Sequence, residues 1–153
     1  MTTAASDPVV EAADNCQYEL GQGPCLSSRT QAVPILVTDV SADSRWPEWS
    51  VAASRLGVAS SVSAPLLAGN EVLGAVKAYS CERHALDPSA VRLLELFAAQ
   101  ATIFITNVQA RENARQLSKI LQDALASRES IAAARGVLMA RHGIDEDAAL
   151  CSN

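Results

Sequence analysis

The stretch DPSAVRLLELFAAQATIFITNVQARENARQLSKILQDALASRESIAAARGVLMARH, residues 87–142, decides the fold because nothing in it interrupts a helix. Its single proline, Pro88, falls in the first turn, where a helix accepts it, and no glycine occurs before Gly136. Apolar residues recur at spacings of three and four, at Val91, Leu94, Ala98, Ala101, Ile105 and Val108, and again at Leu117, Leu121 and Ala124; Ile131 and Leu138 continue the same stripe at spacings of seven. This helical period predicts one helix over residues 87–142, much longer than an ordinary globular helix.

Composition places the chain among globular proteins. Its 153 residues suit one domain plus an appendage, and 49% hydrophobic with 4% aromatic residues predicts a core of Ala, Val, Leu and Ile. We find no continuous apolar run of about 18 residues and no signal peptide in MTTAASDPVV, so we expect a cytoplasmic protein without a transmembrane helix. The four cysteines form no CxxC pair and no disulfide framework, which predicts free thiols.

Charge is distributed unevenly along the chain. Residues 1–110 carry six basic and eleven acidic groups, whereas residues 111–141 carry six basic and three acidic ones. A basic helical segment on an acidic protein hints at a polyanionic partner, although a solvated helix face explains it as well.

The residues before the long helix alternate between helical and extended patterns. We expect helices at 8–18 and 48–56, with one or two helical turns at 25–30. In the first helix, the predicted buried face consists of Val9, Ala12, Ala13 and Cys16. Strands are predicted at 33–40, 58–67 and 72–79, the last two joined by a hairpin at 68–71. This order predicts an α+β fold, an antiparallel sheet with flanking helices; a further short helix is expected at 144–150.

No catalytic motif stands out. There is no Walker loop and no HExxH motif, and we expect neither a catalytic residue nor a metal site. Cys25 follows a Gly-rich turn at a predicted helix start, which can lower a thiol pKa, but we favour a small buried hydrophobe. Cys81 and His84 supply too few ligands for zinc. Trp46 and Trp49 either mark a binding surface or, as we prefer, cap one end of the core.

Several segments together carry a resemblance to a known family. QYELGQGPCL at 17–26, DSRWP at 43–47, GVASSVSAPLL at 57–67 and LGAVKAYS at 73–80 resemble the GAF domains of actinobacterial GAF–ANTAR regulators. The segment from Leu121 to Leu150 looks like the first part of an ANTAR domain, with its signature residues at Ile131, Ala134, Gly136, Leu138 and Met139.

The resemblance implies a GAF/PAS-like sensor at 1–108, a connecting helix at 109–127 and a partial ANTAR-like module at 128–153. It implies a small-ligand pocket, for which the candidates are Cys25, Trp46 and Tyr79, with no cofactor that the sequence can name. It also implies binding of RNA stem-loops in transcription antitermination, for which the candidates are Arg128, Ala134, Arg135, Gly136 and Arg141, and it implies no enzymatic activity. Small residues such as Ala134 and Gly136 would let an RNA backbone approach, although they would equally permit tight helix packing.

Both ends depart from the family pattern. Relatives have further elements before Met1 and beyond Leu150, so we expect a chain truncated at both ends, with weak or lost RNA binding. Two alternatives remain at this point: a GAF-type free methionine sulfoxide reductase, whose partner cysteine is missing near residues 43–49, and a dimerising remnant that does not bind RNA.

The long helix also predicts a partner. Leu93, Leu96, Phe97 and Phe104 lie off the stripe that runs from Val91 to Val108, so the helix is apolar on more than one face. One face can cover the sheet, and the other requires a second partner. We therefore expect a homodimer through the long helix, and neither DNA nor a membrane as a partner.

Overall fold

The computed structural model of the chain describes residues 5–142, and the side chains of residues 5–137. The chain divides into two compact units, Met1–Thr106 and Asn107–Asn153. The predicted helix at 144–150, together with Met139 and Leu138 of the signature, falls outside the part whose side chains are described.

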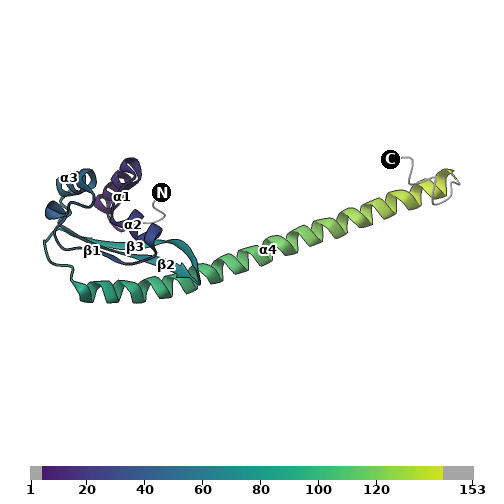
Figure 1. The fold of residues 1–153 in the computed structure, drawn as a ribbon. Helices are drawn as coiled ribbons and strands as arrows, with labels where there is room; N and C mark the ends of the chain where they lie inside the picture. Colours follow the sequence, from purple (N-terminus) through teal and green to yellow (C-terminus); the bar gives the residue numbers. More distant parts are fainter. Residues whose placement is uncertain (1–4, 143–153) are drawn as a thin grey trace. The chain divides into compact units, whose positions relative to one another are not determined.

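The first unit is built on a three-stranded antiparallel sheet in the order β1-β2-β3, with β1 at Ile35–Val37, β2 at Ser60–Ala68 and β3 at Glu71–Ser80. One face carries α1 (Pro8–Leu20), α2 (Pro24–Gln31) and α3 (Pro47–Arg55), and the beginning of α4 runs along the other face (Figure 1). The predicted α+β fold is confirmed.

The strand predicted at 33–40 is shorter than expected. Only Ile35–Val37 pairs with β2, and the chain then turns into η1, a short 3-10 helix at Val40–Ala42. The cause is local, because the Asp39 carboxylate accepts the backbone N–H of Ser41 at 2.9 Å and competes with continued strand pairing.

Helix α1 is capped at both ends and buries a face that differs in part from the predicted one. The Asp7 carboxylate accepts the N–H of Val9 at 2.8 Å, and Gly21 ends the helix with φ 65°. The predicted apolar face is wrong in part, since Val9 is 42% exposed while Asp14 and Gln17 are buried beside Ala13. Polar partners on the sheet beneath α1 account for the difference.

The core of the first unit lies between the sheet and helices α1 and α3. It contains Ala13, Ile35, Val37, Val40, Trp46, Trp49, Ala53 and Val58. The two tryptophan rings meet edge to face, with centroids 6.3 Å apart. Both rings are buried, as predicted for residues that cap the core, and neither lies on an open binding surface.

Helix α4 spans Pro88–His142 and confirms the predicted long helix. Asp87 caps its start by accepting the N–H groups of Ser89 and Ala90 at 2.8 and 3.1 Å. The Ser89 hydroxyl, with these backbone donors, holds the pKa of Asp87 below its usual range. Ala98 and Thr102 of α4 are buried, and the beginning of α4 runs along one face of the sheet (Figure 1).

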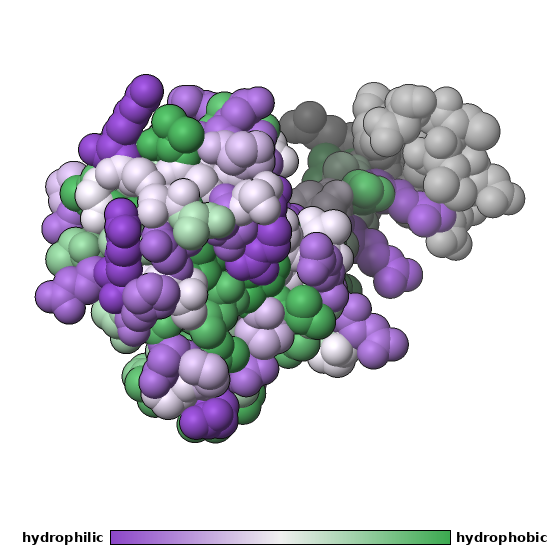
Figure 2. Space-filling view, turned by 60° about the vertical axis from the view of Figure 1, so that its left-hand side comes forward, coloured by the Kyte–Doolittle hydropathy of each residue, from purple (hydrophilic) through white to green (hydrophobic). Residues whose placement is uncertain are grey.

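Other faces of α4 remain uncovered. By length and composition alone, part of the helix between Pro88 and Val137 could cross a membrane, contrary to the expectation from the sequence, and only 11% of that stretch is buried. A single helix of this kind is weak evidence for a membrane protein, because soluble proteins also contain such helices. Figure 2 shows apolar side chains among polar ones on one face of the molecule. Within residues 5–137, whose side chains the structure describes, large apolar side chains of α4 such as Leu96 and Phe104 are thus left exposed.

Candidate functional site

The three predicted ligand residues do not gather at one open pocket. Cys25, at the start of α2, is buried, and its backbone N–H donates to Gln17 Oε1 at 2.9 Å. Trp46 donates its indole N–H to the Ser27 hydroxyl at 3.0 Å, and the Arg45 guanidinium stacks 4.5 Å from its ring centroid. Tyr79, on β3, lies instead in a buried polar network. Of the three, Cys25 and Tyr79 lie near each other.

This network joins α1 and α2 to β3. Gln17 donates from Nε2 to the Tyr79 hydroxyl at 2.7 Å, and that hydroxyl donates to Asp14 Oδ1 at 2.9 Å. The other oxygen of Asp14 forms an ion pair with Lys77 Nζ. Because Gln17 also accepts from Cys25, one continuous chain of polar contacts ties the two helices to the sheet.

Burial sets the electrostatics of this network. It raises the pKa of the Cys25 thiol above its ordinary value, although the Lys77 ammonium works in the opposite direction. Burial, with the nearby Asp14 carboxylate, also raises the pKa of Tyr79 far above its ordinary value. Cys25 is therefore a protonated, poorly nucleophilic thiol at neutral pH, as the buried-hydrophobe interpretation predicts.

Two serine hydroxyls complete the polar face of the sheet. In the register between β2 and β3, Ser61 lies opposite Tyr79 and Ser63 lies opposite Lys77. Residues that lie opposite each other in an antiparallel sheet share a face. Both Ser61 Oγ and Ser63 Oγ are buried without a hydrogen-bond partner. Unpartnered buried polar groups are rare and require an explanation.

Sequence reasoning missed these positions. The strand 58–67 shows only an alternation of small polar and apolar residues, which equally describes a strand with one solvated face. The useful signal is Asp14 and Gln17 at helical spacing in a segment that otherwise has an apolar face. Read together with Lys77 and Tyr79 on a later strand, that spacing can suggest a buried polar site.

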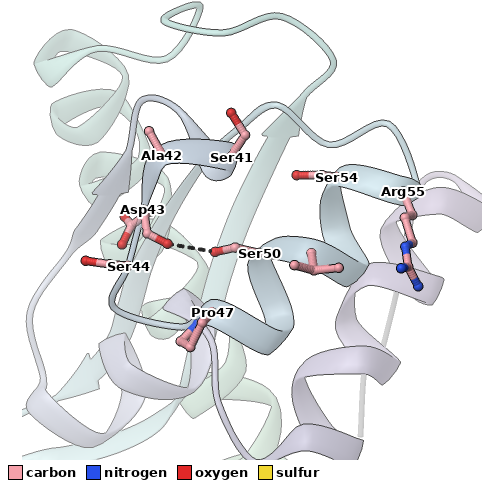
Figure 3. A pocket seen from close by; sticks show the side chains of 9 residues that line it. Ser41, Ala42, Asp43, Ser44, Pro47, Ser50, Ser54 and Arg55 are labelled. Atoms are coloured by element: carbon pink, nitrogen blue, oxygen red, sulfur yellow. Dashed lines mark hydrogen bonds between the residues drawn. The ribbon is translucent and has the colours of Figure 1, made fainter.

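The surface of the first unit also has a cavity of about 530 Å³ along η1 and α3 (Figure 3). It is lined by Ser41, Ala42, Asp43, Ser44, Pro47, Ser50, Val51, Ser54 and Arg55. The Ser50 hydroxyl donates to the Asp43 carbonyl at 3.1 Å, and Arg45 hydrogen bonds hold the pKa of the Asp43 carboxyl below its usual range. None of the predicted ligand residues lines this cavity.

The predicted RNA-binding residues lie on α4 in the second unit. Arg128, Ala134 and Gly136 are exposed, and Arg135 is half-buried. Arg128 and Arg135 are seven residues apart and share a helix face, whereas Ala134 and Gly136 each lie about 100° to one side of Arg135. Arg141 belongs to α4, but its side chain falls outside the described part.

No metal centre forms among the residues that the structure describes. No three of their His, Cys, Asp and Glu side chains come together as metal ligands. Cys81 and His84 lie in the loop between β3 and α4, where Cys81 is an exposed free thiol.

Comparison with known families identifies the class of protein. Residues 2–106 match the GAF domain, and the chain belongs to that family. Residues 119–151 match the ANTAR domain. A GAF domain followed by an ANTAR match is the domain order of GAF–ANTAR regulators. Both matches are to regulatory families, and neither match indicates enzymatic activity.

Solved structures show only a distant likeness. A type II free methionine-R-sulfoxide reductase from Thermoplasma acidophilum is 16% identical with a TM-score of 0.47, over 57% of this chain and 59% of that one. The chain therefore spans less than two thirds of that reductase. A domain of a putative two-component sensor histidine kinase from Sinorhizobium meliloti 1021 is 19% identical with a TM-score of 0.49, over 74% and 99% of the two chains. No curated protein matches the chain.

Proposed function

We propose that this protein is a cytoplasmic regulator that binds RNA stem-loops and prevents transcription termination. The observation that carries the proposal is the ANTAR match on a chain whose GAF domain precedes it, because antitermination is the usual ANTAR role. We assign sensing to residues 1–108, connection to 109–127 and RNA binding to 128–153.

The helix surface in the second unit supports this assignment. Arg128 is exposed, and Arg135 shares its face of α4, so both guanidinium groups can reach the phosphates of one RNA backbone. The small residues Ala134 and Gly136 flank Arg135 and leave room for that backbone. Arg141 extends the basic segment along the helix.

A gel-shift titration tests RNA binding. The probe is a two-hairpin leader RNA, and a scrambled hairpin of equal length is the reference. Arg128→Gln with Arg135→Gln should weaken binding at least tenfold and reduce the slope of log affinity against log salt by about 1 for each arginine. Arg111→Gln, which removes one charge outside the ANTAR match, is the control. Equal affinity for both RNAs would contradict recognition of stem-loops, and no binding to either RNA would leave the dimerising remnant as the better description.

We also assign ligand sensing to the buried polar face of the sheet. Ser61 and Ser63 offer two hydroxyls without partners, and Lys77 and Tyr79 lie beside them in register. A small polar molecule that accepts and donates hydrogen bonds would satisfy these hydroxyls. Entry requires α1 or α2 to move, because both hydroxyls are buried.

A thermal-shift panel of small polar metabolites tests the sensor. A binder at a hundred times its Kd stabilises the folded chain by about 2.7 kcal/mol. Ser61→Ala with Ser63→Ala should abolish that shift without lowering the stability of the free protein, because it removes hydroxyls that have no partner. Ser50→Ala, at the surface cavity, should leave the shift unchanged.

We further propose that the chain is a homodimer through α4. The support is the exposed apolar face of the helix, which includes Leu93 and Phe104, opposite the residues buried along the sheet. Phe104→Glu should therefore yield a folded monomer, whereas Ile105→Glu, at a partly buried position, should destabilise the fold. Sedimentation equilibrium at micromolar concentration, with circular dichroism as the folding control, distinguishes the two. A wild-type monomer would remove the homodimer.

A further inference from the structure

One polar residue lies at the centre of the exposed apolar face of α4. On the surface of a helix, the neighbours of a residue lie three and four positions before and after it. For Gln100, these neighbours are Leu96, Phe97, Ile103 and Phe104. All four are large apolar side chains, with exposed fractions of 67%, 64%, 56% and 71%. Gln100 itself is exposed. We call these five residues the Gln100 ring.

This arrangement restricts what can cover the ring. Any partner that buries the four apolar side chains also removes the Gln100 carboxamide from water, which is costly unless the amide regains its hydrogen bonds. A carboxamide carries both donors and an acceptor, so it is complementary to a second carboxamide. If two copies of the chain pack about a two-fold axis beside Gln100, both present the same surface to each other. The Gln100 carboxamide of one copy then faces that of the other. A lipid tail offers no such partner.

We propose that a second copy of the chain docks on the Gln100 ring about a two-fold axis, and that the carboxamide of Gln100 hydrogen-bonds with that of the partner's Gln100. The inference rests on the homodimer of the proposed function and assigns its centre. A polar side chain within an apolar helical interface fixes the alignment of the two helices, since every shifted alignment leaves it buried and unpaired. Gln100 is therefore a positioning residue of the dimer.

Oxidative cross-linking tests where the axis lies. In a background with the four native cysteines replaced by alanine, Gln100→Cys should form a covalent dimer in high yield under mild oxidation. Glu95→Cys is the control, because Glu95 is exposed but lies about 140° around the helix. Its yield should be at least tenfold lower. A dimer by sedimentation that does not cross-link through position 100 overturns this inference alone, whereas a monomer overturns the homodimer as well.

Two substitutions and a lipid test complete the design. Gln100→Lys should weaken dimerisation at least tenfold at low salt, with partial recovery at high salt, because like charges meet at the axis. Gln100→Asn, which keeps the amide, should retain most of the affinity. Flotation with phosphatidylcholine vesicles tests the other occupant. Flotation of the chain with the vesicles as a monomer contradicts the proposal. Dimerisation that Gln100→Lys leaves unchanged contradicts it as well.

Discussion

Replacing Lys77 with methionine is expected to destabilise the GAF unit by about 3 kcal/mol, because it leaves the Asp14 carboxylate buried without its cation. The side chains of Lys77 and Asp14 are 10% and 1% exposed, so water replaces little of the lost interaction. Breaking such a pair costs roughly 3–5 kcal/mol. We take the lower end because the Tyr79 hydroxyl still donates to Asp14 at 2.9 Å.

Urea unfolding followed by tryptophan fluorescence is the suitable assay. Both tryptophans lie in the core of the first unit, so their emission reports that unit and not the exposed part of α4. A loss of about 1 kcal/mol lowers the Tm of a unit of this size by about 4 °C, so Lys77→Met should lower Tm by roughly 12 °C.

A double-mutant cycle separates the ion pair from other effects of the substitutions. Asp14→Asn keeps an acceptor for the Tyr79 hydroxyl and removes the charge, so the double variant with Lys77→Met has no unpaired charge. We expect a coupling free energy of about 2 kcal/mol between the two sites. Coupling below about 0.5 kcal/mol, the range of surface pairs, would refute the reasoning. Arg83→Met is the matched control, because the Arg83 side chain is 63% exposed and 3.7 Å from Asp39.

Three further outcomes are expected. Hydrogen bonds lower the pKa of Asp87 in the folded state, so they stabilise the start of α4 at pH values above the unfolded pKa of Asp87, about 3.9. This stabilisation is lost as the pH falls through the folded-state pKa. In thermal melts at a series of pH values, Asp87→Asn should remove this pH dependence. The exposed Cys81 should react with a thiol reagent in the native state, whereas Cys25 should react only on unfolding; equal rates by peptide mass spectrometry contradict this. Gly23→Ala should destabilise the fold by about 1–3 kcal/mol, because Gly23 has a φ of +148° and the new Cβ would lie 2.3 Å from the Gln17 side chain of α1. Gly74→Ala, whose Cβ would lie 3.6 Å from the Leu66 side chain, is the control. Urea titration measures both variants.

Local signals in the sequence determined most of the element order. Asp7 with Pro8, and Asp87 with Pro88, mark two helix starts by capping chemistry that needs no tertiary partner. Gly69 marks the hairpin between β2 and β3 because its φ of 62° favours glycine. The helical period of apolar residues within 87–142, in a stretch with no glycine before Gly136, likewise predicts α4 by itself.

The buried polar network could be decided only by the tertiary structure. Asp14 and Lys77 are far apart in sequence, and nothing local distinguishes them from charges on a solvated face. The sheet register brings Ser61 opposite Tyr79, and α1 must pack over them before any of these groups is buried. Periodicity records which residues share a face, but burial depends on what covers that face. For the same reason the sequence reveals the second apolar face of α4, while the structure shows that Gln100 lies at its centre and that the single chain leaves it exposed.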